Sequence, residues 1–108
     1  MEKNLKVIRG DTFSFGVEFE GLNADLDSAY FTIKDSYEGN NIVQKSLSDG
    51  ITKVADGKYK VRVAPSDTVN LSSKNYYYDF QIGVDDDIYT LLYGMIELLP
   101  DITRGVPV

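Results

Sequence analysis

The stretch Tyr76-Tyr77-Tyr78-Asp79-Phe80-Gln81-Ile82-Gly83-Val84 carries the strongest pattern in the chain. Large apolar or aromatic side chains stand at every second position from Tyr76 to Val84, and the positions between them are mostly polar or small. A period of two is expected for a β-strand that buries one of its faces. We therefore predict a strand here, the penultimate one of the chain.

Similar segments lie on both sides of this stretch. The clearest begins at Phe13, where Phe13, Phe15, Val17 and Phe19 would form an aromatic inner face. The full set of further strands that we predict is 5–8, 13–19, 29–34, 42–45, 51–54, 58–63 and 88–99. Residues typical of turns separate them, including Asp56-Gly57, which is typical of a tight hairpin.

Helix signals are nearly absent. One helical turn is predicted at Ser66–Leu71, after Pro65 and with Ser66 as its N-cap. About seven to eight short antiparallel strands in 108 residues predict an all-β fold, an immunoglobulin-like β-sandwich, with a small barrel as the main alternative. We expect a single domain over 1–108, with its core in 5–104 and a C-terminal tail at 105–108.

A tyrosine corner favours the sandwich. In this feature, a tyrosine early in the penultimate strand returns its hydroxyl to the backbone upstream. Tyr78, with Leu71 in the preceding turn and Phe80 two positions on, fits the pattern best, and Tyr76 is the alternative. Phe80 would then stand where antibody domains carry a cysteine.

Composition excludes much of enzyme chemistry. The chain has no cysteine and no histidine, so it cannot build a disulfide, a Ser-His-Asp triad or a zinc site of the usual ligands. A net charge of -6 disfavours nucleic acid as a partner. No apolar run approaches the length of a membrane helix or a signal peptide, so we expect a chain that is cytoplasmic when synthesised and not inserted in a membrane.

The remaining clusters have local explanations. Asp85-Asp86-Asp87 lacks the spacing of a calcium loop and is interpreted as a hairpin turn. The Arg-Gly-Asp triplet at 9–11 falls at a predicted turn between the first two strands. The acids at 18, 20, 25 and 27 are interpreted as surface residues and not as a glycosidase pair. We therefore expect no enzyme activity and predict no catalytic, cofactor-binding or metal-binding residue.

The last strand, 88–99, is apolar on both faces, and two accounts of it stay open. In the first, a β-bulge at Gly94 changes the phase, so that Tyr89 and Leu91 face inward before it and Ile96 and Leu98 after it. In the second, the strand has an aromatic outer patch that forms a protein interface. The members of that candidate interface are Tyr77, Tyr89, Leu91, Tyr93 and Met95.

The order of these segments resembles the N-terminal immunoglobulin-like domain of baseplate upper proteins from tailed bacteriophages. The resemblance spans Val7 to Arg104. It rests on the order and spacing of Arg9-Gly10-Asp11-Thr12, Ala29-Tyr30-Phe31-Thr32-Ile33-Lys34-Asp35, Asp49-Gly50-Ile51, Gly57-Lys58-Tyr59-Lys60-Val61, Asp67-Thr68 with Leu71, Tyr76 with Tyr78-Asp79-Phe80-Gln81, and Thr90-Leu91-Leu92-Tyr93-Gly94-Met95-Ile96-Glu97.

The resemblance implies a virion structural protein of a phage or prophage that works in tail or baseplate assembly through protein–protein contact. Its partners would be other tail or baseplate proteins, its site the virion, and it would need no cofactor. Such proteins usually continue into a stalk or further domains. Self-association stays an open alternative, and so does a second function, a module that binds carbohydrate or a host surface through tyrosines such as Tyr30, Tyr37, Tyr77 and Tyr89.

Overall fold

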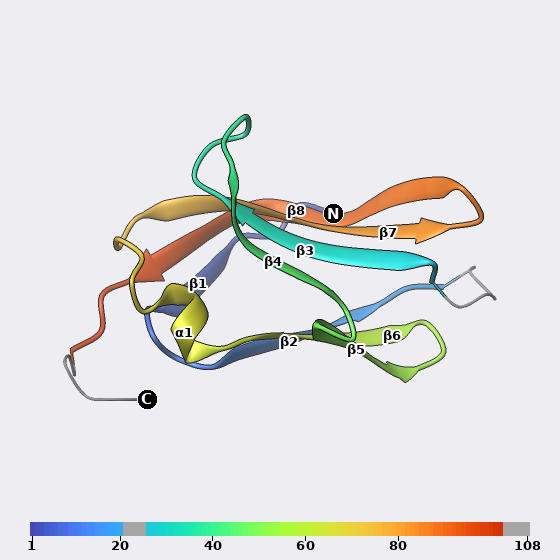
Figure 1. Cartoon of the computed structure of the whole chain (residues 1–108), viewed down its shortest axis with the longest axis horizontal. Helices are drawn as coiled ribbons and strands as arrows, with labels where there is room; N and C mark the ends of the chain where they lie inside the picture. The colour runs from blue at the N-terminus through green and yellow to red at the C-terminus, as the bar shows by residue number, and fades with distance from the viewer. Residues whose placement is uncertain (21–25, 103–108) are drawn as a thin grey trace.

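The structure is a computed structural model that describes residues 1–20 and 26–102 (Figure 1). It contains eight strands and one short helix. In chain order these are β1 (Leu5–Ile8), β2 (Phe13–Glu18), β3 (Ser28–Lys34), β4 (Asn41–Leu47), β5 (Gly50–Ala55), β6 (Lys58–Val63), α1 (Pro65–Thr68), β7 (Asn75–Val84) and β8 (Asp87–Leu99). Each strand predicted from the sequence is present.

The strands form two layers. Hydrogen bonds link them in the order β1-β8-β7-β3-β4-β5-β6-β2. Figure 1 shows β3, β7 and β8 in one layer and β2, β5 and β6 in the other, with β4 passing between them. Only Ser46 and Leu47 of β4 pair with β5, and this short link lets one series of strands fold over into two layers. The predicted sandwich is therefore confirmed.

Most strand pairings are antiparallel as expected, but two are parallel. β1 pairs with β8 in parallel, from Leu5 opposite Ile96 to Ile8 opposite Leu99, and the short β4–β5 contact is also parallel. β1 lies at the edge of β8 and runs in the same direction. After Ile8 the chain turns and enters the other layer as β2.

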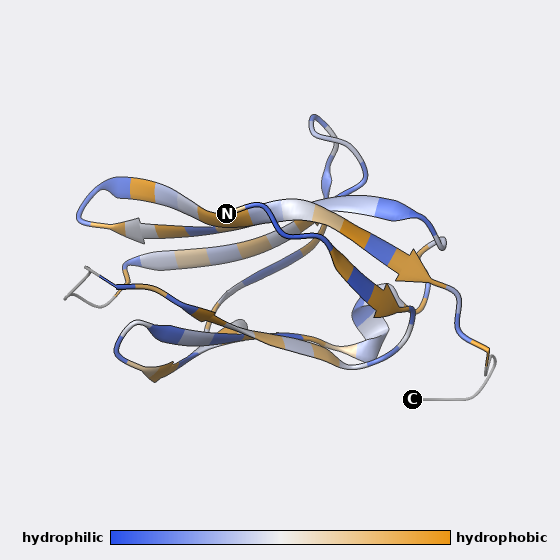
Figure 2. Ribbon diagram, turned by 180° about the vertical axis from the view of Figure 1, so that it is seen from behind, coloured by the Kyte–Doolittle hydropathy of each residue, from blue (hydrophilic) through white to orange (hydrophobic). Residues whose placement is uncertain are grey.

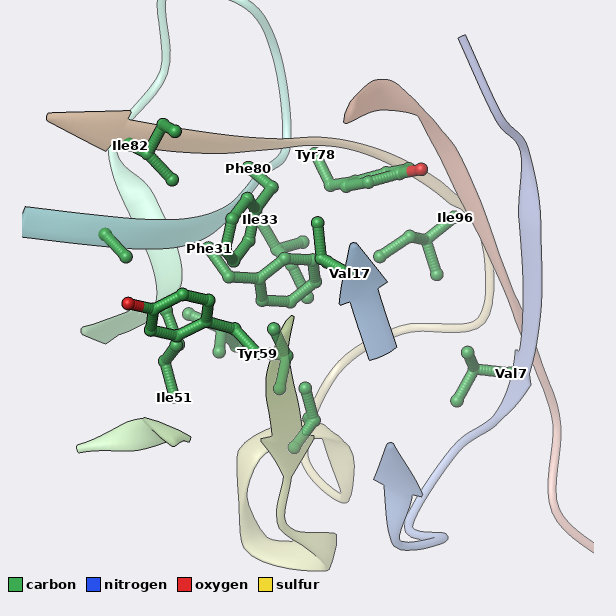
Figure 3. Close-up of a cluster of buried hydrophobic side chains, with 14 of the residues drawn as sticks. Val7, Val17, Phe31, Ile33, Ile51, Tyr59, Tyr78, Phe80, Ile82 and Ile96 are labelled. Carbon is green, nitrogen blue, oxygen red and sulfur yellow. The ribbon is translucent and has the colours of Figure 1, made fainter. Parts of the chain in front are cut away.

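Apolar side chains from both layers fill the space between them (Figure 3). Phe31 of β3 and Phe80 of β7 are opposite each other in the strand register, and neither is exposed. The Phe15 ring of β2, in the other layer, meets the Phe31 ring edge-on at 5.3 Å between centroids. Inner-face positions of β2, β3, β6 and β7 thus provide the core that their alternating sequences predict.

The tyrosine corner is made by Tyr76 and not by Tyr78. The Tyr76 hydroxyl donates to the carbonyl oxygen of Ser72 at 2.8 Å, just upstream in the α1–β7 connection. The Tyr78 hydroxyl instead donates to the carbonyl oxygen of Lys3 at 2.6 Å. Leu71, the other residue assigned to the corner, packs partly buried against the core. Tyr78 lies two residues further along β7, where its hydroxyl reaches the N-terminal segment instead.

The predicted turns are confirmed, but the cap of α1 is not Ser66. Asp85 and Asp86 both have positive φ angles, 50° and 69°, as a two-residue hairpin turn requires. Pro65 occupies the start of α1, so Ala64 is the residue that precedes the helix. The Asp67 carboxylate accepts a hydrogen bond from the Ala64 N–H at 2.7 Å and pairs with the Lys45 ammonium at 2.9 Å.

The N-terminal segment lies along the edge of β8. The Lys3 N–H donates to the Tyr93 carbonyl at 2.9 Å, and the Asn4 side-chain oxygen accepts from the Met95 N–H at 3.1 Å. Gly94 lies between these contacts, and a Cβ atom there would come within 2.4 Å of the Lys3 carbonyl oxygen. Because Gly94 has no side chain, the N-terminal segment can approach β8 closely at this position. Gly94 is not the site of a bulge.

We expect Gly94→Ala to destabilise the fold by more than about 1 kcal/mol, because the added methyl group displaces Lys3 from β8. The matched control is Gly16→Ala in β2, where an added Cβ meets nothing closer than 3.9 Å. Denaturant unfolding measures both variants, and amide hydrogen exchange of residues 3–5 locates the effect. Equal stability of the two variants would contradict the role assigned to Gly94.

Candidate functional site

The outer face of β3, β7 and β8 carries an ordered set of side chains. On β7, Tyr77, Asp79 and Gln81 alternate with the buried residues and so point away from the core. The strand register places three rows across this face, which are Lys34-Tyr77-Met95, Thr32-Asp79-Tyr93 and Tyr30-Gln81-Thr90. We call these nine residues, together with Tyr37, the β3–β7–β8 surface.

Aromatic rings border a hollow in this surface. Tyr37, from the β3–β4 connection, stacks on Tyr77 with ring centroids 4.4 Å apart. Tyr93 lies on the next row and remains 49% exposed. The hollow measures about 170 Å³, and its lining includes the side chains of Thr32, Lys34, Tyr37, Tyr77, Asp79, Thr90 and Tyr93. Aromatic rings, two hydroxyls and one pair of opposite charges therefore converge on one shallow site.

Asp79 is an acidic residue of this hollow whose pKa is shifted. Burial raises the pKa of the Asp79 carboxyl group above its ordinary value, and the nearby Lys34 ammonium partly opposes that shift. The ionised carboxylate is thus poorly solvated where it stands. A cationic or hydrogen-bond-donating group on a ligand would stabilise it.

The strand order and a structural comparison together define the fold. The extracellular domain of the voltage-gated sodium channel beta4 subunit, solved as parallel homodimers, superposes with a TM-score of 0.50 at 11% identity over 94% of this chain and 93% of that one. The fold is immunoglobulin-like. The IG1 domains of the ZIG-8–RIG-5 heterodimer give a TM-score of 0.48 at 8% identity, over 92% and 83% of the two chains. No family model matches the sequence, and no curated protein matches it significantly.

The predicted interface residues of the immunoglobulin-like domain do not all share one face. The register of β7 and β8 shifts between Phe80, opposite Leu92, and Gln81, opposite Thr90, which leaves Leu91 as the extra residue of a β-bulge. Tyr77, Tyr93 and Met95 lie on the outer face. Leu91 packs against the core.

Tyr89, the remaining member of the predicted interface, lies opposite the buried Ile82 and is 44% exposed at the end of the sheet. The bulge accounts for this split, because one extra residue exchanges the two faces of the strand on either side of it. The phase does change, but at Leu91, and an outer aromatic patch exists without Tyr89 and Leu91.

The sequence pattern did not identify the residues of the hollow other than its tyrosines. Lys34 and Thr32 belong to a strand whose outer face was expected to be wet, and Asp79 stood as a polar position in an alternating pattern. Their alternation with Phe31 and Ile33 predicts that they point outward, but not that they meet the outer face of β7. Tyr37 lies outside any strand, so no periodicity locates it.

Two of the other sequence candidates, Arg9 and Asp27, have structural roles. Arg9 of the Arg-Gly-Asp turn donates to the Asp101 carboxylate at 3.0 Å and to the Leu71 carbonyl at 3.1 Å, so it joins the β1–β2 turn to the α1–β7 connection. The Asp27 carboxylate accepts from the Asp85 N–H at 2.9 Å. Asp25, Arg104 and the tail 105–108 lie outside the described residues.

Within 1–20 and 26–102, no three Asp, Glu, His or Cys residues are grouped closely enough to hold a metal ion. No helix in the same residues is long and apolar enough to cross a membrane.

Asp79→Asn is expected to stabilise the domain at neutral pH. Because burial raises the folded-state pKa of Asp79, its ionisation opposes folding at every pH above that value. The gain of the variant should shrink as the pH falls through the raised pKa and should vanish once Asp79 is protonated in both states.

Thermal unfolding from neutral pH to about pH 3 measures this difference, since ordinary Asp groups titrate near pH 3.9. Asp11→Asn, at an exposed turn position, is the control for loss of one surface carboxylate. A gain that grows on acidification would contradict the assigned burial of Asp79.

Proposed function

We propose that this immunoglobulin-like domain is a non-catalytic module that binds a partner protein through the β3–β7–β8 surface. The observation that carries the proposal is the hollow bordered by Tyr37, Tyr77 and Tyr93, with Lys34 and Asp79 inside it. Tyrosine and methionine are enriched at protein interfaces. The poorly solvated Asp79 also gives the surface a charge that a partner could match.

One structural neighbour supports contact between proteins in general terms. The sodium channel beta4 extracellular domains form parallel homodimers that explain a role in cell–cell adhesion. At 11% identity this neighbour shares the fold and nothing more specific. Immunoglobulin-like sandwiches serve many functions, so the proposal rests on the side chains of this chain.

For the setting, we propose a structural part of a phage or prophage virion. The resemblance to baseplate upper proteins motivates this proposal, because it follows the order of segments through nearly the whole chain. The partner would then be another tail or baseplate protein, and the domain would reside in the virion after synthesis in the cytoplasm.

The test measures binding of the purified chain to tail and baseplate proteins encoded beside its gene. Tyr93→Ala is expected to raise the dissociation constant by about tenfold or more, because it removes an exposed aromatic side chain from the proposed binding surface. Val69→Ala, at a residue after α1 that is 42% exposed and lines neither hollow, should bind normally.

Sedimentation of the wild-type chain first determines whether copies associate with each other. If Tyr93→Ala binds every partner as wild type does, the proposed surface is wrong. If the chain only self-associates, and Tyr93→Ala abolishes that association, the surface stands but the partner is a second copy.

The hollow also favours a second candidate function, carbohydrate binding. A stacked tyrosine pair beside Thr32, Asp79 and Thr90 combines a flat apolar platform with hydrogen-bonding groups. A glycan array tests this function. Reproducible binding that Tyr37→Ala abolishes and Tyr89→Ala preserves would place a sugar in the hollow, and an array without hits would reject it.

A further inference from the structure

Strand β2 has a free edge. It stands last in the strand order, and β6 is the only strand that pairs with it within residues 1–20 and 26–102. In constant-type immunoglobulin sheets the first strand lies in the same sheet as the second. Here β1 pairs with β8 instead, so the first strand does not cover this edge.

The hydrogen-bond register shows which backbone groups β2 presents at its free edge. Phe19 N–H donates to the Gly57 carbonyl at 2.9 Å, on the side that faces β6. In an antiparallel pair, successive residues turn their N–H and C=O groups alternately toward the partner strand and away from it. In the register with β6, the N–H and C=O groups of Ser14, Gly16 and Glu18 therefore point away from β6.

The inner side of this edge is apolar and incompletely covered. Phe13 and Phe15 point toward the core, yet both are only half-buried, whereas Val17 of the same strand is 5% exposed. Their rings lie 5.5 Å apart. A strand added beside β2 would place alternate side chains over these two rings, so apolar residues are favoured at those positions.

The outer side of the edge is open and carries three cations against one acid, Glu18. Lys58, Lys60 and Arg62 project from β6, opposite Glu18, Gly16 and Ser14 respectively. All three cations are exposed, and none forms an ion pair with a described residue, although the whole chain has a net charge of -6.

Small residues leave these cations within reach of the free edge. Ser14 and Gly16 present no bulky side chain between the edge and β6, and a groove of about 600 Å³ runs over Gly16, Lys58 and Lys60. A strand added beside β2 would lie roughly 9–10 Å from β6, two strand spacings away, which long acidic side chains can span toward a lysine or arginine.

We propose that the β2 edge accepts an extended segment of a partner protein that alternates apolar and acidic residues. Its backbone would pair with the outward groups of Ser14, Gly16 and Glu18. Its apolar side chains would cover Phe13 and Phe15, and its acidic side chains would extend toward Lys60, which lines the groove, and toward Arg62, the next exposed cation along β6. This site is separate from the β3–β7–β8 surface, so the domain would hold two partners at once.

The probe is a capped eight-residue peptide that alternates valine and glutamate, compared with one that alternates valine and lysine. Titration of the isotope-labelled chain, followed by amide NMR, should show shifts centred on β2 and slowed hydrogen exchange at Ser14, Gly16 and Glu18. The glutamate peptide should bind at least about tenfold more tightly than the lysine peptide. The double variant Lys60→Gln/Arg62→Gln should remove that difference.

Ser14→Pro separates backbone pairing from charge. It deletes one outward N–H without removing a β2–β6 hydrogen bond, so the variant should fold and lose the glutamate peptide, while Ser14→Ala keeps it. If Ser14→Pro does not fold, Lys60→Gln/Arg62→Gln still tests the site, because both side chains are exposed.

Equal binding of the two peptides, no binding at millimolar concentration, or a footprint on the β3–β7–β8 surface would overturn the proposal. So would concentration-dependent protection of β2 in the chain alone, because a second copy would then occupy the edge. The Tyr93→Ala test changes a residue outside the β2 edge, so the failure of this proposal and the failure of the proposed function are distinguishable.

Discussion

The edge-to-face contact between Phe15 and Phe31 is the interaction on which the rest of the structure depends. Phe15 belongs to β2 and Phe31 to β3, so the contact joins the two layers, with ring centroids 5.3 Å apart. Phe31 also contacts the Tyr78 ring and stands opposite Phe80 in the register. The chain has no cysteine for a disulfide between its layers, so packing of this kind must hold them together. Burial of one large apolar side chain contributes about 1.5–3 kcal/mol.

The interior of the domain is filled by apolar side chains. Every inner position of β7 from Tyr76 to Val84 is buried in the core, and within the described residues the acids form no metal-binding group. One layer carries the tyrosine-bordered hollow that includes Asp79, and the other carries the free edge of β2 beside the cations of β6. The N-terminal segment covers the edge of β8, which the close approach of Lys3 to Gly94 allows. β2 stands at the opposite end of the strand order from β1, and its outer edge is the one proposed for a partner strand.

Alternation in the sequence predicts the strands and the inward residues because a buried face requires a period of two. It cannot choose between Tyr76 and Tyr78, which share a face of β7, since the difference lies in which carbonyl each hydroxyl can reach. It also cannot locate the bulge at Leu91, because β8 is apolar on both faces and only its pairing with β7 decides the phase. The hollow needs Tyr37 from a loop and Lys34 from β3, which meet Tyr77 only through tertiary packing. The sequence therefore predicts the scaffold, and it places Tyr77, Tyr93 and Met95 on one outer face, but it does not predict the hollow that Lys34, Tyr37 and Asp79 complete.

The most direct test of the account is a double-mutant cycle across the two layers. Phe15→Leu, Phe31→Leu and the double variant are compared with wild type by denaturant unfolding. If the aromatic contact holds the two layers together, the change in unfolding free energy of the double variant differs by about 0.5–1.5 kcal/mol from the sum of the two single changes. Additivity within about 0.3 kcal/mol would contradict the account, because the layers would then be held together without this contact.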